Sequence, residues 1–136
     1  MASFIYYNFL LDVGKEEFDM ENDTFKVMLL ANTYTPSNEH VDTTDVQSYE
    51  IVGSGYVAGG NTLQNITWTR TGNTATFDAD DISWASATFT ARYGVVYDTA
   101  NNKLVCLIDF GGDKAVSSST FTIRFSVNGI LTATTT

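Results

Sequence analysis

The chain has one cysteine, one histidine and one proline among its 136 residues. A single thiol can form neither an intramolecular disulfide nor a thiolate zinc site. Cys106 lies inside the apolar run Leu104–Ile108, a setting that favours a small buried side chain over a reactive nucleophile. His40 lies in the polar loop Asn32–Thr44 with no obvious partner, so we expect it neither to catalyse a reaction nor to bind a metal.

Basic residues are also scarce. The chain has 7 lysines and arginines against 16 acidic residues, and its formal net charge is -9. Binding to phosphate groups needs a basic patch, so this composition argues against a nucleic-acid partner and against an anionic membrane surface. The apolar stretch Phe4–Leu11 is short, contains Asn8 and follows no positive charge, so we expect neither a signal peptide nor a membrane span.

Motifs for catalysis and for cofactor binding are lacking. The segment Gly53–Ala58 fits a relaxed dinucleotide fingerprint, but a strand is expected after it, where the fingerprint requires a helix. The acidic cluster Asp78, Asp80 and Asp81 lacks the spacing of a calcium loop and is more typical of a turn at a strand end. A carboxylate pair for hydrolysis, which meets in space rather than in sequence, is the alternative. We therefore predict no enzyme activity, no metal and no cofactor.

The chain does show a regular alternation of apolar and polar residues, which is the pattern of a strand with one buried face. In Phe121–Val127 every second residue is apolar, and Phe89–Tyr97 has the same period. Residues typical of hairpin turns separate such segments, at Thr71–Thr74 and at Asn101–Asn102.

The strand candidates recur at intervals of roughly ten residues, which is typical of a sandwich rather than of alternating strands and helices. We predict an all-β fold, a roughly eight-stranded antiparallel sandwich or jelly roll in a single domain over residues 1–136. Residues 1–14 form its N-terminal arm, with one short helix over Phe4–Val13. A strand is also expected at Tyr49–Val52, and a serine-rich loop after Gly111–Lys114.

Aromatic residues divide into two groups. Trp68, Trp84, Tyr93 and Tyr97 alternate with polar residues, so core packing is favoured over a platform for stacking sugars, and Phe125 is expected in the core as well.

The N-terminal aromatics Phe4, Tyr6, Tyr7 and Phe9 are different, because they lie at a terminus where a small sandwich has little room to bury them. We predict a partner contact there; docking into the chain's own core is the alternative.

An ordered set of short motifs, from the N-terminal segment to the end of the chain, resembles a family of small virion proteins of tailed bacteriophages. Taken together the motifs are fairly specific, although each is weak alone. They are Asp23–Leu30, Tyr34–Pro36, Gly53–Gly60, Phe77–Trp84, Thr90–Tyr93, Val96–Asp98, Ile108–Gly111, Phe121–Ile123 and Gly129–Leu131.

The resemblance implies a non-enzymatic structural role on the particle, as a capsid decoration or cement protein that binds the major capsid protein and stabilises the head. It carries over no catalytic residue. We expect a homo-oligomer, dimer or trimer, located on the capsid surface of the virion and in the host cytoplasm during assembly. The alternative is a tail- or fibre-associated protein that binds carbohydrate through exposed aromatics. A small hydrolase using Asp78–Asp81 ranks far below both.

Overall fold

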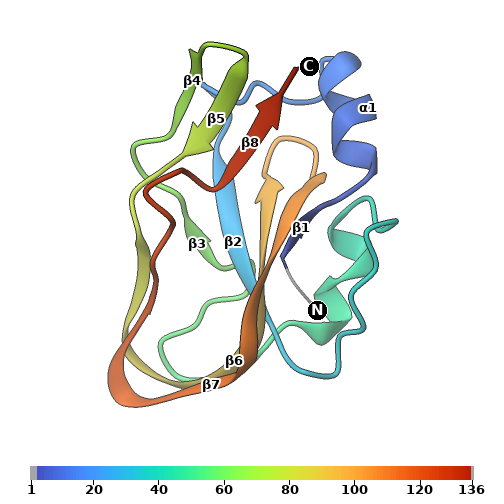
Figure 1. The fold of residues 1–136 in the computed structure, drawn as a ribbon. Coiled ribbons are helices and arrows are strands. Elements are labelled where there is room, and N and C mark those ends of the chain that lie inside the picture. The colour runs from blue at the N-terminus through green and yellow to red at the C-terminus, as the bar shows by residue number, and fades with distance from the viewer. Residues whose placement is uncertain (1–2, 136) are drawn as a thin grey trace.

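The computed structural model describes residues 3–135 and has two antiparallel sheets (Figure 1). One sheet has five strands in the order β1-β7-β6-β2-β3, and the other has three in the order β4-β5-β8. The prediction of an all-β sandwich with a short N-terminal helix is confirmed. The strands are β1 Phe4–Ile5, β2 Phe25–Leu30, β3 Asn61–Thr62, β4 Thr67–Thr71, β5 Thr74–Asp78, β6 Ile82–Asp98, β7 Leu104–Ile123 and β8 Leu131–Thr134. The helices are α1 Asn8–Gly14 and two 3-10 turns, η1 Thr43–Asp45 and η2 Gln47–Tyr49.

The helix predicted over Phe4–Val13 is wrong in its first half. Phe4 and Ile5 form β1 and pair with the apolar strand β7, and the helix begins only at Asn8. Aromatic and β-branched side chains favour strands wherever a neighbouring strand is available to pair with them. The strand predicted at Tyr49–Val52 is also wrong, because this part of the chain forms η2 and then a single bridge from Glu50 to Leu30.

Strands β6 and β7 form one long hairpin that closes at Asn101–Asn102, as predicted, with Asn102 at φ 61. The serine-rich loop predicted after Lys114 is wrong, since β7 continues through the serines to Ile123. Figure 1 shows the hairpin bending sharply at the bottom of the view. The bend coincides with register shifts between Trp84 and Phe89. Ser86 and Ser118 adopt φ values of 51 and 46 there, so bulges in both strands make the bend.

Two hydrophobic cores lie on opposite faces of the five-stranded sheet. One fills the space between the sheets and contains Phe25, Phe77 and Trp84. The other is covered by Tyr34 and Val46, from the segment between β2 and β3, and by the N-terminal arm. Strand β2 is therefore buried on both faces, which explains its nearly continuous apolar sequence.

The alternating segment Phe89–Tyr97 follows its prediction only in its first half. Burial alternates as far as Tyr93, whereas every residue from Tyr93 to Tyr97 is buried, because a core lies on each face of the sheet there. The side chains predicted to share one buried face also enter different cores. Phe89 and Ala91 lie in the core between the sheets, whereas Tyr93, like Tyr97, lies in the other one. The pairing register shifts between Ala91 and Tyr93, and an irregularity of this kind moves the following side chains to the opposite face.

The second alternating segment follows its prediction only in part. Phe121 and Ile123 are buried, Phe125 is half-buried, and Val127 is 99% exposed. Strand β7 ends at Ile123 and the chain turns at Ser126–Gly129, so the period-two rule no longer applies beyond the strand.

Candidate functional site

The three acidic residues considered as catalytic groups each accept a hydrogen bond that stabilises local structure. Asp78 Oδ1 accepts a hydrogen bond from its neighbour's amide, at Ala79. Asp80 Oδ2 accepts one from the Asn65 side chain at 2.6 Å, and Asp81 Oδ1 accepts one from the amide of Phe125 at 2.9 Å. No group of three or more histidine, cysteine, aspartate or glutamate side chains within residues 3–135 is arranged to hold a metal ion.

His40 does have a partner, contrary to the expectation from sequence. Its Nδ1 lies 2.7 Å from the hydroxyl of Tyr34, which in turn lies 3.2 Å from the hydroxyl of Tyr6. Burial, reinforced by the hydrogen bond to Tyr34, raises the pKa of Tyr6. These three side chains connect the N-terminal arm to the loop before η1. No local sequence pattern predicts the contact between Tyr6 and Tyr34, because the two residues are far apart in the chain.

Cys106 is buried, as predicted, and burial raises the pKa of its thiol to about 12. At neutral pH the thiol is therefore protonated and a poor nucleophile. Trp84, Tyr93 and Tyr97 are also buried, and the half-buried Trp68 packs near Phe77. These four rings form no sugar-stacking platform on the surface.

Asp98 is a buried carboxyl group with an unusual environment. Its Oδ1 accepts a hydrogen bond from the amide of Ala100, and its Oδ2 has no hydrogen-bond donor within residues 3–135. Burial, and then the neighbouring Asp23 carboxyl, raises its pKa to about 7 from 3.8. The folded state therefore holds this proton more tightly than the unfolded chain does.

The raised pKa of Asp98 predicts a pH-dependent stability. Between pH 3.8 and about 7 the folded state binds more protons than the unfolded state, so the contribution of this group is present at low pH and is lost as the pH rises through 7. Asp98→Asn removes the titration. In urea titrations, the free energy of unfolding of the variant minus that of wild type should be larger at pH 8 than at pH 4.5. An equal difference at both pH values would show that Asp98 does not titrate in this range.

The N-terminal aromatics have divided roles. Tyr6 and Phe9 are buried in the chain's own cores, so the premise that they lack room there is wrong for these two. Phe4 is half-buried against Tyr6, with ring centroids 5.2 Å apart. Tyr7 alone of the four is largely exposed, at 66%.

Helix α1 and its N-cap residue Tyr7 carry an exposed apolar surface, which we call the helix patch: Tyr7, Leu10, Leu11 and Val13. Leu10 is 69% exposed and Leu11 52%. Residues spaced by three and four share one face of a helix, which brings Tyr7, Leu10 and Leu11 together. The opposite face is fixed by Phe9, whose ring centroid lies 5.2 Å from that of Phe18, and by the buried Asp12.

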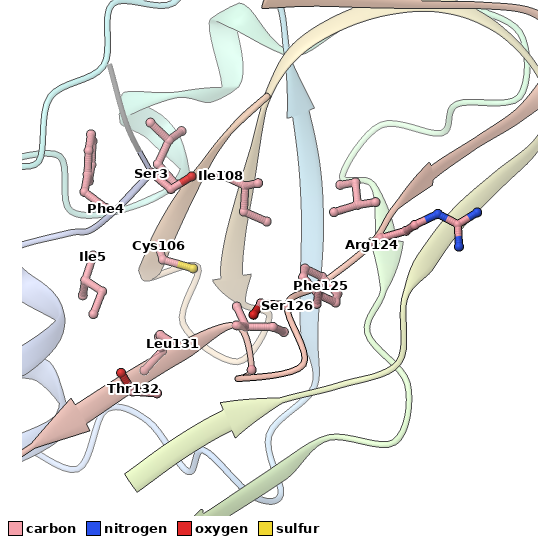
Figure 2. Close-up of a pocket in the computed structure, with 14 residues that line it drawn as sticks. Ser3, Phe4, Ile5, Cys106, Ile108, Arg124, Phe125, Ser126, Leu131 and Thr132 are labelled. Carbon is pink, nitrogen blue, oxygen red and sulfur yellow. The ribbon is translucent and has the colours of Figure 1, made fainter. Parts of the chain in front are cut away.

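A groove opens between the two sheets, on the side where β1 forms the edge of the larger sheet (Figure 2). We call it the open-side groove, and its volume is about 360 Å³. Ile5, Cys106 and Ile108 line it from the larger sheet. The segment between β7 and β8 and the start of β8 line it from the other side, with Phe125 and Leu131.

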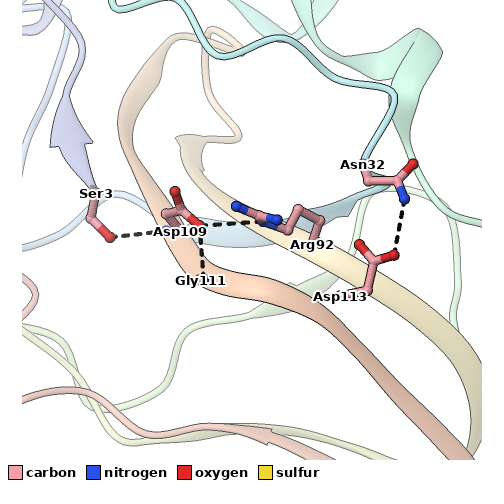
Figure 3. A network of polar contacts seen from close by, with 6 residues as sticks. All are labelled: Ser3, Asn32, Arg92, Asp109, Gly111 and Asp113. Atoms are coloured by element: carbon pink, nitrogen blue, oxygen red, sulfur yellow. Dashed lines mark hydrogen bonds and ion pairs between the residues drawn. The ribbon is translucent and has the colours of Figure 1, made fainter. Parts of the chain in front are cut away.

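A polar network lies beside this groove, at the point where β7 bulges (Figure 3). Asp109 Oδ1 accepts a hydrogen bond from the amide of Gly111 at 2.8 Å and lies 3.4 Å from Arg92 Nε. The amide of Asp109 donates to Ser3 Oγ at 2.9 Å. These contacts fix the irregular part of β7 against the N-terminal arm, so their role is structural.

Comparisons with protein-family models, with curated proteins and with solved structures give no match to this chain. None of the helices within residues 3–135 has the length and apolar character needed to cross a membrane.

Proposed function

We propose that this protein is a non-enzymatic structural protein of a tailed-phage virion, a decoration protein that attaches to the lattice of the major capsid protein through the helix patch. The observation that carries the proposal is the concentration of exposed apolar side chains at α1. Seven large hydrophobic residues are exposed within the described chain, and Tyr7, Leu10, Leu11 and Val13 are four of them. The resemblance to small virion proteins supplies the class of partner.

The helix patch is suited to a permanent contact. The chain is strongly acidic overall, with a formal net charge of -9, which favours solubility before assembly. A cluster of apolar side chains on such a surface marks a site of association. Because Phe9 anchors α1 to the core, the patch is presented by a rigid helix, which lowers the entropy lost on binding.

The helix patch yields a prediction for binding. Full burial of a leucine side chain contributes about 1.5–3 kcal/mol, and each leucine here is already partly buried. The double variant Leu10→Ala/Leu11→Ala should therefore bind expanded capsids roughly 10- to 100-fold more weakly in a co-sedimentation assay. Alanine preserves helix propensity, so the melting temperature should change little.

The matched control is Val52→Ala, because Val52 is 95% exposed and lies outside α1. It should bind like wild type. Wild-type affinity in the double variant would exclude the helix patch as the contact. Binding of the wild-type protein to purified tails but not to capsids would contradict the decoration role and support the tail-associated alternative. A deletion of residues 2–9 would not test the helix patch by itself, because it also removes β1 and the core residues Tyr6 and Phe9.

A further inference from the structure

The two sheets have four edge strands, β1 and β3 in one and β4 and β8 in the other. An exposed edge can pair with another chain, and proteins protect edges with short strands, charges, proline or a covering element. Strands β1 and β3 have only two residues each. Strand β4 carries Arg70 near its centre. These three edges are protected.

Strand β8 is the exception. Its sequence is Leu-Thr-Ala-Thr, with no charge and no proline over four residues. Within residues 3–135, β5 is the only helix or strand that packs extensively along it. The second edge of β8 therefore has neither a charge nor a proline, and no other strand or helix of the described residues pairs with it.

The hydrogen-bond pattern shows which groups this edge offers. The amide of Thr135 donates to the carbonyl of Asn73 at 2.9 Å, just beyond the β5–β8 ladder. Bonded and non-bonded residues alternate along an antiparallel strand. Leu131 and Ala133 therefore direct their backbone groups toward β5, and Thr132 and Thr134 direct theirs toward the free edge.

The open-side groove lies beside this edge, and Leu131 and Thr132 belong to its lining (Figure 2). Its wall is mostly apolar, and Arg124 is its one charged residue. The site thus offers backbone hydrogen bonds on one side, an apolar cavity next to them, and a cation at the rim.

We propose that the free edge of β8 is a docking site for an extended segment of a partner protein, which pairs with Thr132 and Thr134 as a fourth strand and places apolar side chains in the open-side groove. Alternate positions of the segment are apolar, because successive side chains of a strand point to opposite faces. A carboxylate of the segment meets Arg124. A second copy of this chain that pairs through its own β8 is a poorer occupant, since β8 carries no carboxylate that could meet Arg124. This proposal is argued from β8 and the open-side groove alone and does not depend on a role in a virion.

The probe is a displayed library of random ten-residue peptides, selected on the immobilised full chain. Enriched peptides should alternate apolar and polar residues and carry an acidic residue. Thr132→Pro removes the amide that faces the free edge while leaving the β5 ladder intact, and proline is tolerated on edge strands. It should weaken binding of a selected peptide at least tenfold, whereas Thr132→Val, which keeps the amide, should bind like wild type.

Hydrogen exchange on the wild-type protein makes the test independent of how well the proline variant folds. A bound peptide should slow exchange at the amides of Thr132 and Thr134 at least tenfold. Enriched peptides without alternation, or exchange at Thr132 and Thr134 that the peptide leaves unchanged, would overturn the proposal. So would sedimentation that shows a wild-type dimer abolished by Thr132→Pro, because the occupant would then be a second copy.

Discussion

Replacing Gly60 by alanine should destabilise the protein more than any other single change considered for this chain. A Cβ atom at this position would lie 1.7 Å from the carbonyl oxygen of Val27, which is far inside contact distance. Gly60 also has φ +83, a conformation that side chains with a Cβ rarely adopt. The neighbouring atom belongs to the backbone of β2, which pairs with β6 on one side and with β3 on the other, so a shift of this atom would disturb the sheet. We expect a loss of about 4 kcal/mol or more in the free energy of unfolding, or no folded protein.

Gly14 provides the matched control, because a Cβ there meets nothing within 4 Å. It is the last residue of α1, where alanine is a better helix former than glycine by roughly 0.5–1 kcal/mol. Gly14→Ala should therefore be neutral or slightly stabilising in the same urea titration. A folded Gly60→Ala variant that loses less than about 1 kcal/mol would show that the backbone at Gly60 does not approach β2 this closely.

Truncation of Trp84 to alanine should have the second largest effect. The side chain is 2% exposed in the core between the sheets. Its ring stacks at 6.3 Å from Tyr56 and meets Phe121 edge-on at 5.9 Å. Removing a buried aromatic leaves a cavity and costs about 3–5 kcal/mol. Denaturant unfolding followed by circular dichroism measures this directly.

Phe125→Ala should cost clearly less, because Phe125 lies beyond the end of β7 and is half-buried against the same core. The sequence alone predicted equal burial for Trp84 and Phe125. A loss of the same size in both variants would mean that the segment after Ile123 continues the strand and its alternation.

Much of the strand content could be predicted from sequence, because alternation and turn residues are local signals. The hairpin turns at Thr71–Thr74 and Asn101–Asn102 and the burial of Phe89 and Trp84 follow from such signals. The bent β6–β7 hairpin could not be predicted, because its bulges depend on which residue lies opposite which across the pair. The serines after Lys114 have the composition of a loop, and they are part of a strand only because β6 pairs with this segment.

The candidate site was predicted only in part, for a similar reason. Tyr7 was singled out correctly as an exposed aromatic, but Leu10 and Leu11 were not, although their spacing from Tyr7 is that of one helical face. Phe9, Leu10 and Leu11 follow one another in the sequence, and three consecutive apolar residues of a helix cannot all lie on one buried face, so this signal was available. The position of β8 at the edge of its sheet could not be predicted from the sequence, because the order of strands in a sheet decides which strands are edges.

A cryo-electron map of the virion tests the central claim most directly. The account predicts density for this protein at regularly repeated positions over the capsid lattice, with the Tyr7, Leu10 and Leu11 face of α1 against the major capsid protein. Density confined to the tail, or capsid-bound protein with α1 turned toward solvent, would contradict it.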